Sequence, residues 1–210
     1  MGLVMDGLLC YNAGQISLPE GCRLLSELNY QHFELMAQLE ETYYSRDYIT
    51  PAEESYRWYR RHPYSTLVVA DGDEIAGFVN LFPVKAEVFA ALLAGQLNDH
   101  DMGAEAMLNP AEHAEEGLEM FLSCVVVSPR HRGGRLVPAM LKEAIKPYLP
   151  YLPCCRRVIT DNVTDDGERF SRRYGFRPLG HSGHASKLYM QDFADFIRRI
   201  EAATLPDSAG

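Results

Sequence analysis

The segment from Leu118 to Tyr148 constrains the fold of this chain more than any other part of the sequence. Residues 118–127 form a short apolar run ending in three valines, which is the composition of a buried β-strand. Pro129 ends the strand, because proline cannot donate to a continuing ladder. A basic loop with two glycines follows, and then apolar residues recur at helical spacing: Leu136, Val137, Met140, Leu141, Ala144, Ile145 and Tyr148. The pattern predicts a strand, a glycine-bearing loop and a helix.

This loop also predicts an anion site. The start of a helix offers unpaired backbone N–H groups and the positive end of the helix dipole, and glycines let a phosphate approach the backbone closely. The whole chain carries a formal net charge of −9, yet residues 130–135 contain Arg130, Arg132 and Arg135. Arginine suits multidentate contact with phosphate. The loop therefore indicates a phosphorylated ligand, with solvated arginines on an ordinary strand-to-helix turn as the alternative.

Composition narrows the class of protein. With 210 residues, 47% apolar and 23% charged, the chain has the make-up of a globular protein of one substantial domain. The acidic balance argues against nucleic-acid binding and leaves room for an amine substrate. The five cysteines are odd in number and lack framework spacing, which favours a reducing compartment. The N-terminus lacks the basic region of a secretory signal, and no apolar run is long enough for a membrane span. We expect a cytoplasmic protein without a membrane partner.

The rest of the chain alternates between helical and strand patterns. Asp71–Gly72–Asp73 between two β-rich runs is a strong hairpin signal. Thr50 with Pro51, and Thr164 with two aspartates after it, are signals for helix starts. In order, the further elements expected are a strand near 22–29, a helix through 33–43, a helix from Thr50, a hairpin of 65–70 and 74–82, a strand over 155–161, a helix from Thr164 to Gly175, a hairpin of 176–180 and 186–190, and a helix over 193–200.

Residues 84–117 read as an insertion before the central strand. Residues 84–97 have the pattern of an amphipathic helix, and 98–117 are acidic without a clear period. Such a segment could be a lid over an acceptor site or a decorative loop. Residues 1–20 read as a possible arm and 205–210 as a frayed tail, around a single domain that spans residues 1–210.

Two segments resemble those of the GNAT superfamily of N-acetyltransferases. Residues 125–137 are similar to the acetyl-CoA segment V-x-P-x-x-R/Q-x-x-G-x-G/A, with Arg132 at the R/Q position. Arg135 stands where the family usually has its second glycine, and Val137 where it has Gly or Ala. Residues 164–176 resemble N-x-x-A-x-x-F-Y-x-x-x-G-F through Phe170, Gly175 and Phe176. The order of the predicted elements is also that of the family.

The resemblance implies an α+β fold with a central mixed, mostly antiparallel sheet flanked by helices. It implies an acyl-CoA-dependent N-acyltransferase that uses acetyl-CoA as co-substrate, acts on an amine of a small molecule or protein, and needs no metal. In the family the central strand splays from its neighbour and holds the pantetheine arm. The oligomeric state stays open, with a homodimer among the options. The resemblance carries the cofactor-binding role onto Val125, Val127, Arg132, Gly133, Gly134, Arg135, Leu136, Val137 and Thr164.

Amine attack on a thioester needs a base and a proton donor for the leaving thiolate. By strand alternation Glu119 would share a face with Ser123, Val125 and Val127, so it is the predicted base, with a solvated strand-end glutamate as the alternative. Ser171 occupies the position where many family members carry the tyrosine that protonates the thiolate. A serine hydroxyl is a poorer proton donor than a phenol. Tyr174, further along the same helix, is a second candidate or else a core residue.

Other chemistry is weaker in the sequence. Cys154 and Cys155 with His181 and His184 suit a tetrahedral metal site badly, so no metal is predicted. Two alternatives to an enzyme stay open. One is a GNAT-like module that binds acyl-CoA without efficient catalysis, and the other is a plain nucleotide-phosphate binder.

Overall fold

The computed structural model describes residues 17–97, 99–183 and 185–204. The predicted arm falls mostly, and the predicted tail wholly, outside these residues. The described residues form a seven-stranded sheet in the order β1-β2-β3-β4-β5-β7-β6. All neighbouring strands are antiparallel except β4 and β5, which run parallel. The mixed, mostly antiparallel sheet is thereby confirmed. The strands are β1 (Cys22–Leu24), β2 (Thr66–Asp71), β3 (Glu74–Val84), β4 (Leu118–Val127), β5 (Cys155–Asn162), β6 (Arg177–His181) and β7 (Lys187–Asp192).

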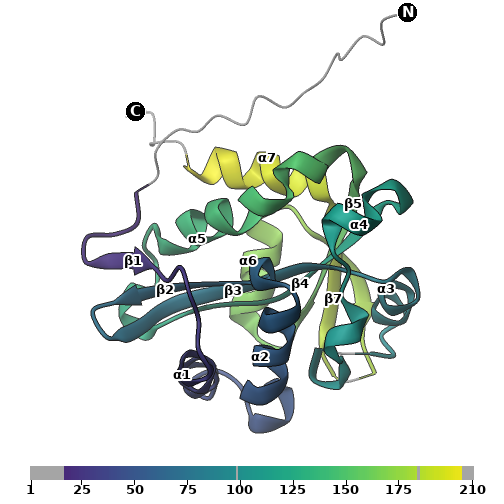
Figure 1. Cartoon of the computed structure of the whole chain (residues 1–210). Coiled ribbons are helices and arrows are strands. Elements are labelled where there is room, and N and C mark those ends of the chain that lie inside the picture. The colour runs from purple at the N-terminus through teal and green to yellow at the C-terminus, as the bar shows by residue number, and fades with distance from the viewer. Residues whose placement is uncertain (1–16, 98, 184, 205–210) are drawn as a thin grey trace, which may run out of the picture.

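Helices cover both faces of this sheet (Figure 1). Above it in the figure lie α5 (Leu136–Ile145) and α7 (Phe193–Thr204), and below it lie α1 (Tyr30–Glu40) and α2 (Ala52–Arg61). The insertion contributes α3 (Ala86–Leu93) and α4 (Pro110–His113), and α6 (Asp165–Arg173) follows β5. Among the described helices, none combines the length and the apolar character needed to cross a membrane.

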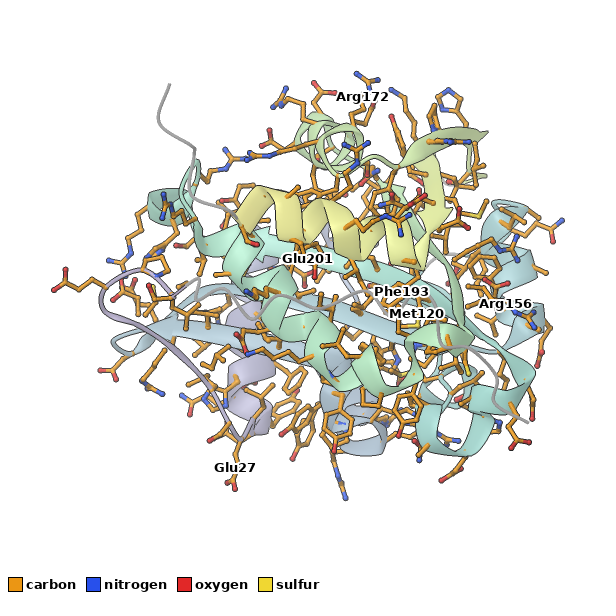
Figure 2. The ribbon with its side chains drawn as sticks, turned by 90° about the horizontal axis from the view of Figure 1, so that it is seen from above. Glu27, Met120, Arg156, Arg172, Phe193 and Glu201 are labelled. Carbon is orange, nitrogen blue, oxygen red and sulfur yellow. The ribbon has the colours of Figure 1, made fainter. Side chains whose placement is uncertain are left out.

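Strand alternation divides the core between the two faces. Along β5, Val158 packs toward α5 and α7, whereas its neighbour Ile159 packs toward α2 and α3. Figure 2 shows α7 lying across the sheet, with Met120 of β4 and Phe193 of α7 close together in the first of these clusters. A third cluster, around Phe78, joins β2, β3 and β4 to α1. Fully buried aromatic side chains in all three clusters hold the helices on the sheet.

Local signals explain both ends of α6. Thr164 caps α6, since its Oγ1 accepts a hydrogen bond from the Gly167 N–H at 3.1 Å. Gly175 ends that helix with a φ of +85°, a conformation that favours glycine. The cap predicted at Thr50 was wrong, because α2 begins at Ala52 with Pro51 in the capping position and no side-chain cap. The strand expected over 22–29 is confirmed only as the short β1.

The insertion packs against the sheet beside α2. Its Phe89, Leu92, Met102 and Met107 share a buried cluster with Trp58 of α2. The Trp58 indole N–H donates to the Met102 carbonyl at 3.2 Å, which ties α2 to the segment after α3. The structure therefore gives the insertion a packing role, and its role as a lid stays a prediction.

We expect Trp58 to be a main stabilising contact of this region. Trp58→Ala should lower the free energy of unfolding by about 3–5 kcal/mol, because the substitution leaves a cavity. Trp58→Phe should cost about 1–3 kcal/mol, because the Met102 carbonyl loses its indole donor. Urea unfolding followed by circular dichroism measures both. Tyr64→Ala, at a side chain exposed to 65%, is the control and should stay within about 0.5 kcal/mol of wild type. An equally small effect at Trp58 would contradict this account of the packing.

Candidate active site

A cavity of about 870 Å³ lies where β4 and β5 separate. The parallel pairing of the two strands ends at Phe121 and Ile159, and the later residues of β4 have no register partner on β5. The open edge of β4 forms one wall, and the end of β5 with α6 forms the other. The lining comes from six segments, and its main members are Glu40, Tyr43, Tyr44, Asp99, Ser123, Cys124, Val125, Val127, Arg132, Gly133, Gly134, Val137, Asp161, Asn162, Thr164, Asp166, Tyr174 and Ser186.

A β-bulge lies at the narrow end of this opening. On β3, Leu81 pairs with Leu122 and Asn80 pairs with Cys124, so Ser123 is the extra residue of β4. A bulge residue is left outside the ladder and its strand bends locally. Backbone groups at such a place are of the kind that can stabilise an oxyanion.

The bulge also overturns the predicted placement of Glu119. It shifts the side-chain alternation by one residue, so Cys124 lies on the α1 face of the sheet while Val125 lies on the α5 face. Glu119 therefore does not share a face with Val125 and Val127, and it does not line the cavity. Its buried carboxylate instead accepts hydrogen bonds from the Arg157 guanidinium, which lies 4.8 Å from the centre of the Phe89 ring.

The basic loop forms one end of the cavity. Gly133 adopts a φ of +74°, and a Cβ there would meet no atom within 4 Å, so the backbone is open on that side. Arg132 pairs with Asp166 of α6 and lies 4.9 Å from the centre of the Tyr43 ring. The Tyr43 hydroxyl donates to the Val127 carbonyl at 2.8 Å. Arg132 therefore reaches across the mouth of the cavity from the loop to α6.

The loop residues predicted to bind the cofactor divide into two groups. Arg132, Gly133, Gly134 and Val137 line the cavity, as do Val125, Val127 and Thr164 from the neighbouring elements. The Leu136 side chain is buried in the core below α5, so only its backbone could meet a ligand. Arg135 occupies the capping position of α5, and it lines a separate, smaller pocket with Arg130 and His131.

The opposite end of the cavity is acidic, which sequence reasoning missed. Glu40 at the end of α1 accepts a hydrogen bond from the Cys124 thiol at 3.2 Å. Asp99 of the insertion accepts one from the Ser123 hydroxyl at 2.7 Å, and Asp161 of β5 accepts one from Ser186 at 2.7 Å. No spacing signal could have revealed this group, because its members come from distant segments.

Burial controls the ionisation of these groups. Burial, helped by the nearby Asp99 carboxylate and opposed by the hydrogen bond from Cys124, raises the pKa of the Glu40 carboxyl to about 8. Burial raises the pKa of Asp99 as well, and the charge of Asp161 adds to the effect. Burial and the Glu40 charge raise the pKa of the Cys124 thiol. Cys124 is therefore a protonated donor and not a nucleophile.

The structure separates the two candidates for a proton donor. Ser171 is fully buried and does not line the cavity, since its hydroxyl accepts a hydrogen bond from the Asn162 amide at 2.7 Å. Tyr174 does line the cavity, and its hydroxyl has no hydrogen-bond partner among the described residues. Its ring packs against Phe170 and Phe196, and burial raises its pKa to about 12. Tyr174 is thus both a core residue and part of the cavity wall.

The comparisons with known proteins agree with this arrangement. The model of the acetyltransferase (GNAT) family matches residues 33–176. The chain is similar in fold to Ard1 from Thermoplasma volcanium, at 13% identity and a TM-score of 0.53, over 82% of this chain and 97% of that one.

Two further solved structures show the same fold. The loading GNATL domain of CurA from Lyngbya majuscula is 15% identical, with a TM-score of 0.58 over 81% of this chain and 97% of that one. Naa50 from Arabidopsis thaliana, solved in complex with a bisubstrate analogue, is 10% identical. The TM-score is 0.54 over 82% of this chain and 99% of that one. No curated protein matches the chain. Because the family model covers more than half of the sequence, the chain belongs to the GNAT acetyltransferase family.

Proposed function

We propose that this protein is an N-acyltransferase that transfers acetyl from acetyl-CoA to an amine of a small molecule or protein, by direct attack in a ternary complex. The observation that carries the proposal is the opening between β4 and β5. A basic loop at a helix start lies at one end of this opening, and a group of buried carboxylates lies at the other. The two ends suit the two substrates of such a reaction.

The basic end suits the diphosphate of coenzyme A. The backbone N–H groups of Leu136 and Val137, in the first turn of α5, have no helical partner, whereas Pro138 has no N–H and the Ala139 N–H donates to the Arg135 carbonyl. Gly133 and Gly134 leave room beside these two groups. The free edge of β4 from Ser123 to Val127 offers backbone donors and acceptors for the two amides of a pantetheine arm, as a sheet edge does for an added strand. To contact a phosphate, the Arg132 guanidinium would either leave Asp166 or bind Asp166 and the phosphate together.

The acidic end suits a cationic acceptor. Glu40, Asp99 and Asp161 line the same part of the cavity, and the first two have raised pKa values because they lie away from water and near one another. An ammonium group among them would relieve this repulsion and gain charge-assisted hydrogen bonds. This grouping of carboxyl groups is a local feature of the cavity, so it is stronger evidence for a cationic acceptor than the net charge of the whole chain.

Glu40 replaces Glu119 as the proposed base in this arrangement. An ammonium has no lone pair, so it must lose a proton before it attacks the thioester carbonyl. A carboxylate with a pKa near 8 accepts that proton at a lower free-energy cost than an ordinary glutamate, because its pKa lies closer to the pKa of the ammonium group. Backbone groups at the Ser123 bulge would face the developing oxyanion. Tyr174 stays the proposed proton donor for the thiolate, and Ser171 is assigned to packing.

Release of coenzyme A during incubation of the protein with acetyl-CoA and a panel of amines tests the proposed activity. We expect turnover with cationic amines and saturable binding of acetyl-CoA. Arg132→Glu should weaken that binding by about 10–100-fold, the range for one charge-assisted contact. Arg60→Glu, an exposed position on α2, makes the same charge change and should leave binding intact. Binding without turnover would favour the non-catalytic module, and displacement of acetyl-CoA by ATP would favour a plain nucleotide-phosphate binder.

The pH dependence tests the assignment of Glu40. Because its carboxyl must be ionised to accept a proton, kcat/KM should fall as the pH drops through about 8. Glu40→Gln should lower kcat/KM by roughly 10²–10⁴-fold and remove this pH limb. The acceptor amine should have a pKa well above the pH range of the assay. Its own ionisation then contributes the same slope to the pH profiles of wild type and variant. Glu119→Gln is the matched control and should keep the limb, so a limb that survives in Glu40→Gln would exclude Glu40 as the base.

A further inference from the structure

A cluster of three potential metal ligands lies outside the cavity, between the basic loop and the edge of the sheet. Cys22 of β1, Asp71 of β2 and His131 of the loop each offer one ligand atom, and all three atoms lie within 4.8 Å of one another. Cys22 and Asp71 are cross-strand partners in the β1–β2 ladder. Gly21, with a φ of +84°, precedes the strand, and a Cβ there would lie 3.0 Å from Asp71 Oδ1. The turn therefore needs glycine to bring Cys22 opposite Asp71.

Two of the three distances between the ligand atoms match a tetrahedral site. Cys22 Sγ lies 3.8 Å from His131 Nε2, and this nitrogen lies 3.3 Å from Asp71 Oδ2. Ordinary zinc–ligand bond lengths at a tetrahedral angle place a sulfur about 3.6 Å from a nitrogen, and a nitrogen about 3.3 Å from an oxygen. The sulfur and the carboxylate oxygen lie within 4.8 Å of one another, so a metal ion on Nε2 is within reach of both.

The orientation of His131 distinguishes a metal site from a nucleophilic cysteine. In a catalytic Cys–His–Asp arrangement the thiol and the carboxylate lie at opposite ring nitrogens. Here both converge on Nε2, whereas Nδ1 lies 2.7 Å from the Ser128 hydroxyl. A hydrogen bond to the other ring nitrogen is what usually orients a metal-bound histidine.

Charge and donor type identify the metal. A thiolate, a carboxylate and a neutral imidazole carry two negative charges in total, which a divalent cation balances. Sulfur and nitrogen donors together favour zinc over magnesium or calcium. Arg130 lies 3.6 Å from Asp71 Oδ2, but it also pairs with Glu74, so a metal can displace it without leaving the guanidinium alone.

We propose that Cys22, Asp71 and His131 bind one zinc ion, with a fourth position left to water. Nothing in the proposed acyl transfer requires this site. Its position gives it a structural consequence, because His131 belongs to the same loop as Arg132 and Gly133. A bound ion would tie that loop to the edge strand β1 and so fix the loop that closes the basic end of the cavity.

Zinc uptake by the purified full-length protein tests the proposal. We expect one zinc per chain in competition with a chelating dye, and a rise in melting temperature on adding zinc, since a ligand that binds the native state stabilises it. Ser128→Ala removes only the hydrogen bond that orients His131 and should weaken zinc binding by about 10–100-fold. Cys22→Ser should weaken it further. Cys154→Ser, at a partly exposed free cysteine away from the cluster, should bind as wild type does.

A second measurement needs no variant. The wild-type protein titrated with cobalt(II) should develop a thiolate-to-cobalt charge-transfer band, which adding zinc removes.

The melting temperatures of all variants without metal separate weak binding from failure to fold. The proposal is overturned if wild type takes up no stoichiometric zinc, or if Cys22→Ser, folded, binds zinc as tightly as Cys154→Ser. Neither result bears on acetyl transfer, which the coenzyme A release assay measures separately.

Discussion

The early end of hydrogen bonding between β4 and β5 is the constraint on which the site depends. A parallel pair normally continues along the strands, but here the register stops at Phe121 and Ile159. The two halves of the sheet stay together through packing on the face covered by α5 and α7, where residues of both strands are buried, Met120 and Val158 among them. The Tyr148 hydroxyl adds a buried hydrogen bond to the Leu81 carbonyl at 2.6 Å. The opening can therefore be kept without unfolding the core.

The same opening separates two kinds of charge. Arg132 and the start of α5 form the basic end, whereas the carboxyl groups of Glu40, Asp99 and Asp161 form the acidic end. In the proposed reaction, two substrates of opposite charge enter from different sides and meet near the Ser123 bulge. This is the physical reason for preferring an acyltransferase over a plain nucleotide-phosphate binder, which would need only the positive end.

Local patterns were enough to predict much of the fold. The Asp71–Gly72 hairpin, the glycine loop and the Thr164 cap each depend on a few neighbouring residues, so the sequence contains the whole signal. The family resemblance supplied the mixed sheet and the splay of its central strand. The Ser123 bulge has no such marker, since neither glycine nor proline lies in β4, and missing it placed Glu119 on the wrong face.

The parts of the site that could not be predicted are those assembled from distant segments. Glu40 ends the first helix, Asp99 belongs to an insertion without a clear period, and Asp161 lies in a separate strand, β5. Cys22, Asp71 and His131 are likewise far apart in the chain, so no ligand spacing appears. Only tertiary contacts bring these groups together, and the sequence pattern contains no record of them.

A crystal structure of the protein with a non-hydrolysable thioether analogue of acetyl-CoA tests the central claim most directly. The account predicts the pantetheine arm along the free edge of β4 between Val125 and Val127, the diphosphate at the backbone N–H groups before and within the first turn of α5, and the acyl group beside Ser123 and Glu40. An analogue bound outside the β4–β5 opening, or an opening left empty at a saturating concentration, would contradict it.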